Sequence, residues 1–154
     1  MKLSKNFSLK EFTKSQTAAR KGIDNTPDIQ AAINLTALCN NVLQAIRDEK
    51  GSVTINSGYR CTELNRAIGS SDTSQHRVGE AADIEVMGVD NYELAQWIDD
   101  NIVFDQLILE GYEDGDTNSG WLHISYKADG SNRNKTLTAR FVNGKANYTN
   151  GIHN

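Results

Sequence analysis

The sequence has little cysteine and almost no proline: its 154 residues contain only Cys39, Cys61 and Pro27 of these types. Two cysteines so far apart do not make a disulfide scaffold, and they lack the paired spacing of a cysteine-rich zinc site. We therefore expect both thiols to be reduced and packed. Without a proline-rich linker to divide it, the chain is expected to form one domain over residues 1–154, with an N-terminal arm over residues 1–25.

The chain also lacks a basic stripe and any long apolar run. Its formal net charge is -4, and the acidic residues are dispersed, which argues against a nucleic-acid partner. No segment approaches the roughly 18 apolar residues that cross a bilayer. Residues 1–12 carry no apolar signal-peptide segment. We expect synthesis in the cytoplasm and no membrane span, so action outside the cell would need another carrier.

The longest helix is expected over residues 27–50, with Thr26 as its N-cap and Gly51 as its stop. Apolar residues at near-helical spacing should form its buried face: Ile29, Ile33, Leu38, Val42 and Ile46. Within the arm, the spacing of Ser8 and Glu11 predicts a short capped helix. Residues 13–25 are interpreted as a loop.

Most of the remaining chain is expected to be strand. Strands are predicted over residues 53–56, 81–86, 103–110, 121–126, 137–142 and 145–148, helices over 62–68 and 90–100, and a loop over 70–79. The last two strands flank Asn143-Gly144, which is typical of a type I′ hairpin turn. Helices followed by strands predict an α+β fold with an antiparallel sheet.

Two of the three histidines lie where they could share a site with an aspartate. His76 precedes the strand that carries Asp83, and His123 lies in the middle of a later strand. Taken alone, each is better explained as an ordinary packed, solvated or capping residue. Together they form a three-ligand set that leaves a fourth position for water, as catalytic zinc sites do.

Hydrolysis at zinc also needs a carboxylate that accepts a proton from water. Glu110 ends the strand before the loop that leads to His123. If these two strands pair as a hairpin, Glu110 comes beside the metal. The loop carboxylates remain alternatives: Glu113, Asp114 and Asp116.

Arg60 is a candidate for binding substrate. It follows Ser57-Gly58-Tyr59 at a junction between a strand and a helix, where its side chain could enter a cleft. A guanidinium there could bind a substrate carbonyl, a carboxylate or the developing oxyanion. An ordinary surface arginine is the alternative.

These residues resemble a known family, the zinc D-alanyl-D-alanine carboxypeptidases. The likeness is carried by Ser57-Gly58-Tyr59-Arg60, Leu64-Asn65, Ser74-Gln75-His76 with Gly79, Ala81 and Asp83, and Trp121-Leu122-His123. It is closest to the phage endolysin-like members, which also tend to carry the Phe-x-x-x-Glu-Phe and Asn-x-Pro patterns of residues 7–12 and 25–27. The resemblance covers nearly the whole chain. It implies the fold shared with the Hedgehog signalling domain, with helices packed on one face of the sheet.

The resemblance also implies a role for each site residue. His76, Asp83 and His123 would bind Zn2+, and Arg60 and Ser74 would bind substrate. Gln75 is expected to contact substrate or to hydrogen-bond to a metal ligand.

The chain departs from many relatives at Gly120, where they place the catalytic acid three residues before the second zinc histidine. Glu110 is therefore the expected catalytic base, by analogy with relatives that carry it on the preceding strand. Trp121 is expected to pack beneath the site. His153 matches nothing in the family and is interpreted as a tail residue.

The implied function is a zinc metallopeptidase that hydrolyses peptide bonds of bacterial peptidoglycan. It would act as a phage lysin-like endopeptidase or as a D,D-carboxypeptidase on peptidoglycan stem peptides. We expect a monomer that reaches the cell wall after release or as a virion component. The alternative is a non-catalytic, zinc-stabilised wall-binding module of the same fold, which Gly120 supports.

Overall fold

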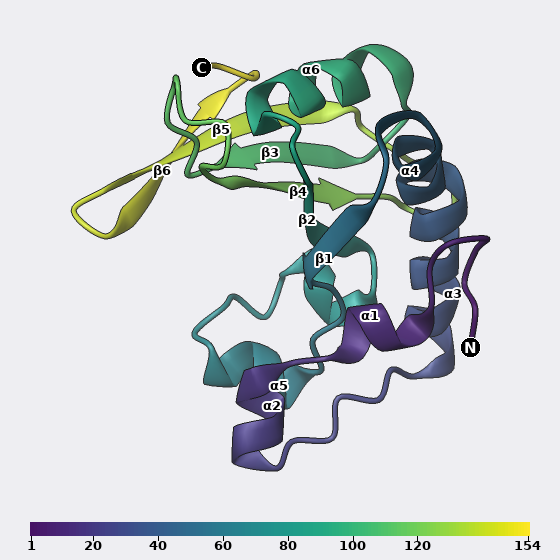
Figure 1. Cartoon of the computed structure of the whole chain (residues 1–154). Helices are drawn as coiled ribbons and strands as arrows, with labels where there is room; N and C mark the ends of the chain where they lie inside the picture. Colours follow the sequence, from purple (N-terminus) through teal and green to yellow (C-terminus); the bar gives the residue numbers. More distant parts are fainter.

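Six strands form one mixed sheet in the computed structural model, which describes all 154 residues (Figure 1). The strands are β1 Val53–Ser57, β2 Ala81–Val86, β3 Gln106–Glu110, β4 Trp121–Ser125, β5 Lys135–Val142 and β6 Lys145–Asn150. The α-helices are α1 Leu9–Thr13, α2 Gln16–Lys21, α3 Ile29–Leu38, α4 Gln44–Lys50, α5 Thr62–Ala67 and α6 Asn91–Asn101. A π-helical turn, η1 Cys39–Leu43, joins α3 to α4, and a 3₁₀ turn, η2 Gln75–Val78, precedes β2.

The predicted α+β class is confirmed, but the sheet is not antiparallel throughout. Its order is β1-β2-β4-β3-β5-β6, and β3 and β5 pair in parallel while all other neighbours are antiparallel. Residues 126–134 carry the chain from the end of β4 past β3 without crossing the length of the sheet. Strand β5 therefore starts at the same end as β3 and runs in the same direction.

One face of the sheet builds the core. Alternate strand residues on this face are buried: Ala82, Ile84, Leu107, Leu109, Leu122 and Ile124. They join side chains of α3, α4 and α6 in a cluster that runs from Leu3 to Ile124 and includes Phe7 and Phe12 of the N-terminal arm. Figure 1 shows α6 lying along the sheet beside β3. The opposite face is left for polar side chains, and the site described below lies there.

The long helix begins two residues later than predicted. Its N-cap is Asp28, whose Oδ1 accepts a hydrogen bond from the Ala31 N–H at 2.8 Å. Thr26, the predicted cap, instead donates from its N–H and its hydroxyl to Asp24 Oδ1. The Asx interaction at Asp24 holds Thr26 in a turn outside the helix.

The buried face of this helix also differs from the prediction. Ile29 and Ile33 are 81% and 50% exposed, whereas Ala31 and Leu35 are buried. Leu38, Val42 and Ile46 are buried as predicted. Four-residue spacing alone assigned Ile29 and Ile33 to the wrong stripe, because two neighbouring stripes of this helix both carry apolar residues.

Smaller differences lie at element boundaries. The predicted loop over residues 13–25 contains α2, which is capped by Ser15: its hydroxyl accepts from the Ala18 N–H at 3.1 Å. Strand β3 starts at Gln106 and not at residue 103.

Cys39 and Cys61 are free thiols. None of the helices combines the length and apolar character that a membrane span requires.

Candidate metal centre

Strand register lines up the candidate residues on the polar face of the sheet. Asp83 of β2 pairs directly with His123 of β4. Two residues earlier on β4, Trp121 pairs with Glu110 at the end of β3. Glu110 in turn pairs with Ala139 of β5, which pairs with Tyr148 of β6, so these residues form a row across the sheet. Because side chains two residues apart share a face, both rows point toward one site.

His76 reaches this site from η2, outside the sheet. Ser74 caps η2, since its hydroxyl accepts from the His76 N–H at 3.3 Å. The His76 side chain is buried, and its Nδ1 lies 2.7 Å from the carbonyl oxygen of Gly58. A carbonyl can only accept, so we assign the proton to Nδ1. The lone pair of Nε2 is then directed at Asp83.

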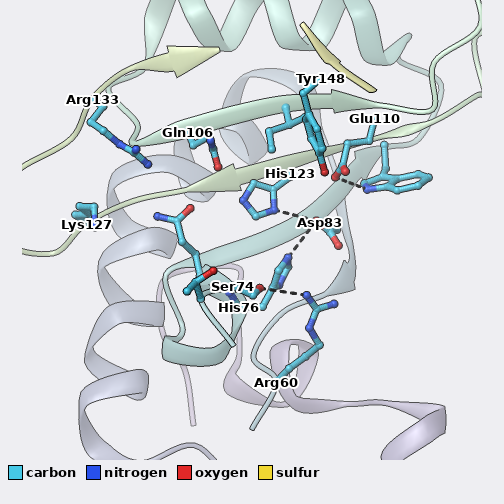
Figure 2. A pocket seen from close by; sticks show the side chains of 14 residues that line it. Arg60, Ser74, His76, Asp83, Gln106, Glu110, His123, Lys127, Arg133 and Tyr148 are labelled. Atoms are coloured by element: carbon cyan, nitrogen blue, oxygen red, sulfur yellow. Dashed lines mark hydrogen bonds and ion pairs between the residues drawn. The ribbon is translucent and has the colours of Figure 1, made fainter. Parts of the chain in front are cut away.

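Three potential ligand atoms converge at Asp83 (Figure 2). Asp83 Oδ1 lies 3.3 Å from His76 Nε2 and 3.4 Å from His123 Nδ1. Each of the three residues offers one ligand atom, and these atoms all lie within 4.8 Å of one another. Atoms bound at about 2.0–2.2 Å around a tetrahedral zinc ion lie about 3.3–3.5 Å apart. The two spacings from Asp83 Oδ1 to the imidazole nitrogens fit a metal of this size.

The chemistry of the donor set also fits a metal ion. Asp83 Oδ1 is buried and no protein donor satisfies it, although the two imidazole nitrogens lie nearby. A buried charged oxygen without a donor is costly. A cation between the oxygen and the two nitrogens would satisfy all three atoms. Two imidazoles favour zinc, copper, iron or nickel over magnesium or calcium.

The charge state of Asp83 suits a ligand. Burial acts to raise the pKa of this carboxyl, but the interactions with His123 and His76 outweigh burial and hold the pKa below its usual range. The carboxylate is therefore deprotonated at neutral pH, as metal binding requires.

Glu110 lines the same cavity and is held by Trp121. The Trp121 Nε1–H donates to Glu110 Oε2 at 3.0 Å, and the indole stacks on Phe141. Burial, followed by the charge of Asp83, raises the pKa of Glu110, against the opposing effects of His123, Trp121 and Arg60. A raised pKa makes a carboxylate a better proton acceptor near neutral pH. Trp121 thus contacts Glu110 and lines the cavity, in addition to packing.

Arg60 enters the cavity from the junction of β1 and α5. Its Nη1 donates to Ser57 Oγ at 3.3 Å and its Nη2 to Ser74 Oγ at 3.5 Å, while Nε is buried without a partner. Burial lowers the pKa of Arg60, and Asp83 and Glu110 act in the opposite direction. The guanidinium is therefore positioned beside the metal cluster with capacity to donate further.

Gln75 hydrogen-bonds to an aspartate outside the metal cluster and to none of the metal-cluster side chains. Its Nε2 donates to Asp105 Oδ2 at 2.8 Å, and its Oε1 is buried without a partner. The expected hydrogen bond from Gln75 to a metal ligand is therefore wrong. Gln75 lines the cavity, so its expected contact with substrate stays a prediction.

A cavity of about 660 Å³ brings these side chains together. It is lined by His76, Asp83, His123, Glu110, Arg60, Ser74, Gln75 and Trp121 among others. The alternative bases Glu113, Asp114 and Asp116 do not line it, and His153 is not part of the metal cluster.

Six further lining residues were not predicted from the sequence: Thr73, Gln106, Ile108, Lys127, Arg133 and Tyr148. Alternation along β6, together with the predicted hairpin at Asn143-Gly144, could have indicated the face of Tyr148. Lys127 and Arg133 lie in an irregular loop without a motif, so no sequence signal indicated them.

The model of the family described as Peptidase M15 matches residues 5–125. The matched segment contains the metal cluster, Arg60 and Glu110, and it ends before Lys127, Arg133 and Tyr148. No curated protein matches the chain.

Proposed function

Because the chain belongs to the peptidase M15 family, we propose that it is a zinc-dependent peptidase that hydrolyses peptide bonds of bacterial peptidoglycan. The observation that carries this proposal is the convergence of two imidazoles on one buried, unpartnered carboxylate oxygen at 3.3 and 3.4 Å. Peptidoglycan as the substrate rests on the resemblance of the motif segments to D-alanyl-D-alanine carboxypeptidases.

His76 Nε2, Asp83 Oδ1 and His123 Nδ1 would hold the zinc ion. A bound zinc ion lowers the pKa of a coordinated water and polarises a carbonyl group. Glu110 moves the protons: because Trp121 occupies Oε2, the Oε1 atom is free to accept a proton from the attacking water. Glu110 then donates this proton to the leaving amine, as a single carboxyl acting first as base and then as acid.

Arg60 stabilises the charge that develops on the carbonyl oxygen of the scissile bond. Its guanidinium retains unused N–H groups and is fixed by Ser57 and Ser74. Donors fixed before the reaction cost no reorganisation in the transition state. Ser74 thereby positions Arg60, and it also lines the cavity.

Digestion of purified peptidoglycan, with mass spectrometry of the products, tests the proposal. Zinc-loaded protein should release new amino groups, a chelator should abolish the release, and added zinc should restore it. Release of free D-alanine would identify a carboxypeptidase, and release of larger peptide fragments an endopeptidase. Absence of any release by zinc-loaded protein would refute the proposal.

Glu110→Gln tests the role of the base. We expect a loss of roughly 10²–10⁴-fold in kcat, since this is the usual contribution of general acid–base catalysis. Glu113→Gln is the matched control, because Glu113 lies in the exposed loop outside the cavity. Undiminished activity of Glu110→Gln would remove Glu110 from the mechanism.

The presence of Glu110 in the cavity favours hydrolysis over the non-catalytic wall-binding alternative. That alternative was suggested by Gly120, but Glu110 lines the cavity with the metal cluster and has a raised pKa. Binding of the protein to cell walls without any cleavage would favour the alternative.

A further inference from the structure

One side of the cavity serves neither the metal cluster nor Glu110. It is lined by Gln75, Gln106, Lys127 and Arg133, and Figure 2 shows Lys127 and Arg133 on the side opposite Glu110. We propose that this side is a subsite for an N-acylated amino-acid residue with a free carboxylate. Lys127 and Arg133 bind the carboxylate, and Gln75 Oε1 accepts the neighbouring amide N–H. The proposal rests on the proposed function, since the ligand is part of the same peptide substrate.

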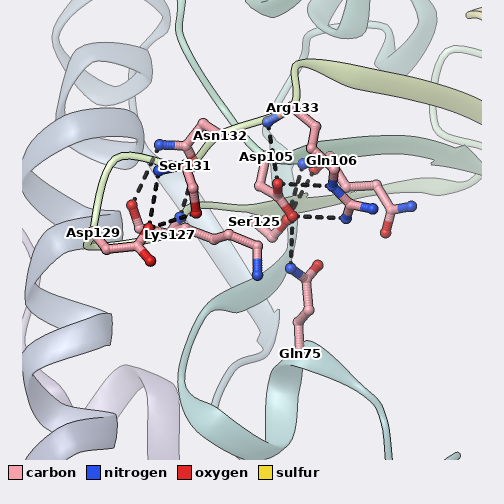
Figure 3. Close-up of polar contacts among 9 residues, drawn as sticks. All are labelled: Gln75, Asp105, Gln106, Ser125, Lys127, Asp129, Ser131, Asn132 and Arg133. Atoms are coloured by element: carbon pink, nitrogen blue, oxygen red, sulfur yellow. Dashed lines mark hydrogen bonds and ion pairs between the residues drawn. The ribbon is translucent and has the colours of Figure 1, made fainter.

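Asp105 lies between Arg133 and Gln75 and joins them (Figure 3). Its side chain is fully buried and accepts hydrogen bonds from Arg133 N at 3.2 Å, Arg133 Nε at 3.0 Å, Arg133 Nη2 at 2.8 Å and Gln75 Nε2 at 2.8 Å. Burial acts to raise the pKa of Asp105, but these bonds outweigh it and lower the pKa to about 2. Asp105 thus remains charged and fixes both side chains. Arg133 Nη1 makes no hydrogen bond within the protein and is free to donate to a ligand.

Lys127 is presented by an ordered loop. Its N–H donates to Asn132 Oδ1 at 2.8 Å, and Asn132 Nδ2 donates back to the Lys127 carbonyl at 3.3 Å. Asp129 accepts from the Ser131 N–H at 2.9 Å and closes the same loop. The Lys127 ammonium makes no hydrogen bond or ion pair, although it lines the cavity. It is therefore a cation available for an anionic ligand.

Nearby acids do not occupy this side of the cavity. Lys127 lies close enough to Glu80 and Asp129 to act toward a lower pKa of both carboxyls, but neither carboxyl lines the cavity. Asp105 is already paired with Arg133. The charged groups that face the cavity here are therefore the two cations.

Gln75 adds a requirement that a simple anion does not meet. Because Asp105 binds Nε2, the amide orientation is fixed, and Oε1 is left buried without a donor. A buried acceptor gains from an N–H donor of the ligand. A carboxylate and an acylated amine on one carbon supply both groups. This chemistry occurs at the C-terminal residue of a peptide and at a γ-linked glutamyl residue.

Lys127 and Arg133 lie beyond residues 5–125, the segment shared with the family. The sheet topology brings them to the cavity, because the loop over residues 126–134 passes from β4 around the end of β3. The two cations of the subsite thus come from the segment that follows the family match.

Calorimetry with a defined peptide tests the subsite. The probe is L-Ala-γ-D-Glu-L-Lys-D-Ala-D-Ala with both carboxylates free, compared with its C-terminal amide and with its glutamyl amide. Zinc-loaded protein carrying Glu110→Gln is used as the background, so that the peptide is not consumed. Lys127→Gln should weaken binding of the fully charged peptide roughly tenfold, the usual scale for losing one charge-assisted hydrogen bond.

Two further variants separate charge from structure. Lys127→Arg should retain most of the affinity, because it keeps the cation. Lys145→Gln, at the exposed start of β6 and outside the cavity, should leave the affinity unchanged. One of the two amidated peptides should bind more weakly, and its affinity should no longer change in Lys127→Gln. The carboxylate that is amidated in that peptide is the one that occupies the subsite.

The outcomes distinguish this proposal from the proposed function. Equal affinity for all three peptides, unchanged affinity in Lys127→Gln, or no binding of the charged peptide would each overturn the subsite. If unsubstituted protein fails to hydrolyse peptidoglycan but binding still depends on Lys127, the reaction is refuted and the subsite stands. Hydrolysis with affinity insensitive to Lys127 gives the reverse conclusion.

Discussion

Replacing Gly120 by alanine should destabilise the protein and impair the site, although Gly120 contributes no side chain to it. Gly120 precedes β4 with φ of +70°, and an added Cβ would lie 2.3 Å from Glu110 O and 2.8 Å from Tyr112 N. Both atoms belong to the backbone of the neighbouring segment and cannot rotate away. In this backbone conformation, position 120 has no room for an acidic side chain.

The magnitude follows from two separate effects. A left-handed backbone costs a non-glycine residue roughly 1–2 kcal/mol. Forcing the Cβ against the Glu110 carbonyl adds roughly 1–3 kcal/mol, the usual cost of overpacking. We therefore expect Gly120→Ala to lower the free energy of unfolding by about 2–5 kcal/mol. The Glu110 backbone must also shift, and a displacement on the order of 1 Å at a catalytic group can cost roughly 100-fold in rate.

Urea denaturation of matched variants measures the steric part. Gly115→Ala is the control: Gly115 has φ of +87°, but an added Cβ there meets no atom within 4 Å. In the control, the free energy of unfolding should therefore fall only by the cost of the left-handed backbone. The difference in free energy of unfolding between the two variants then measures the collision with Glu110. Equal destabilisation of Gly120→Ala and Gly115→Ala would refute this reasoning.

Two other predictions concern the metal cluster and the base. Zinc at about 100 times its dissociation constant should stabilise the metal-free protein by about 2.7 kcal/mol, which raises Tm by roughly 5–10 °C. Calorimetry should show this shift in unsubstituted protein and not in His123→Ala; equal shifts would contradict the site. Trp121→Phe removes a hydrogen bond that lowers the pKa of Glu110, so that pKa should rise further. Because Glu110 acts deprotonated, activity is lost as pH falls through its pKa, and the acidic limb of kcat/KM should move to higher pH. If the acidic limb of the kcat/KM profile stays at the same pH in Trp121→Phe, then that limb does not report the ionisation of Glu110.

Local patterns in the sequence were sufficient for the parts of the site held by neighbouring strands. The alternation around His123 placed it on one face with Trp121 and Ser125, and the pairing of β3 with β4 brings Glu110 opposite Trp121, two residues from His123. His76 and Asp83 are separated by a short turn, so their proximity depends on few residues. Local contacts of this kind are largely determined by spacing, and spacing is visible in a sequence.

Features that depend on distant pairing were not visible. Ile29 and Ile33 have a helical spacing, yet they are exposed because the helix packs through its neighbouring stripe. The prediction of an antiparallel sheet failed at β5, whose partner is determined by competition among whole strands for positions in the sheet.

The sequence by itself determined the α+β class and the candidate metal donors, because hydrophobic periodicity and ligand chemistry are properties of short segments. Only the tertiary structure decided that β5 lies parallel to β3, and with it that Lys127 and Arg133 line the cavity. Their placement is the result of packing energies summed over the whole sheet, which no local pattern records.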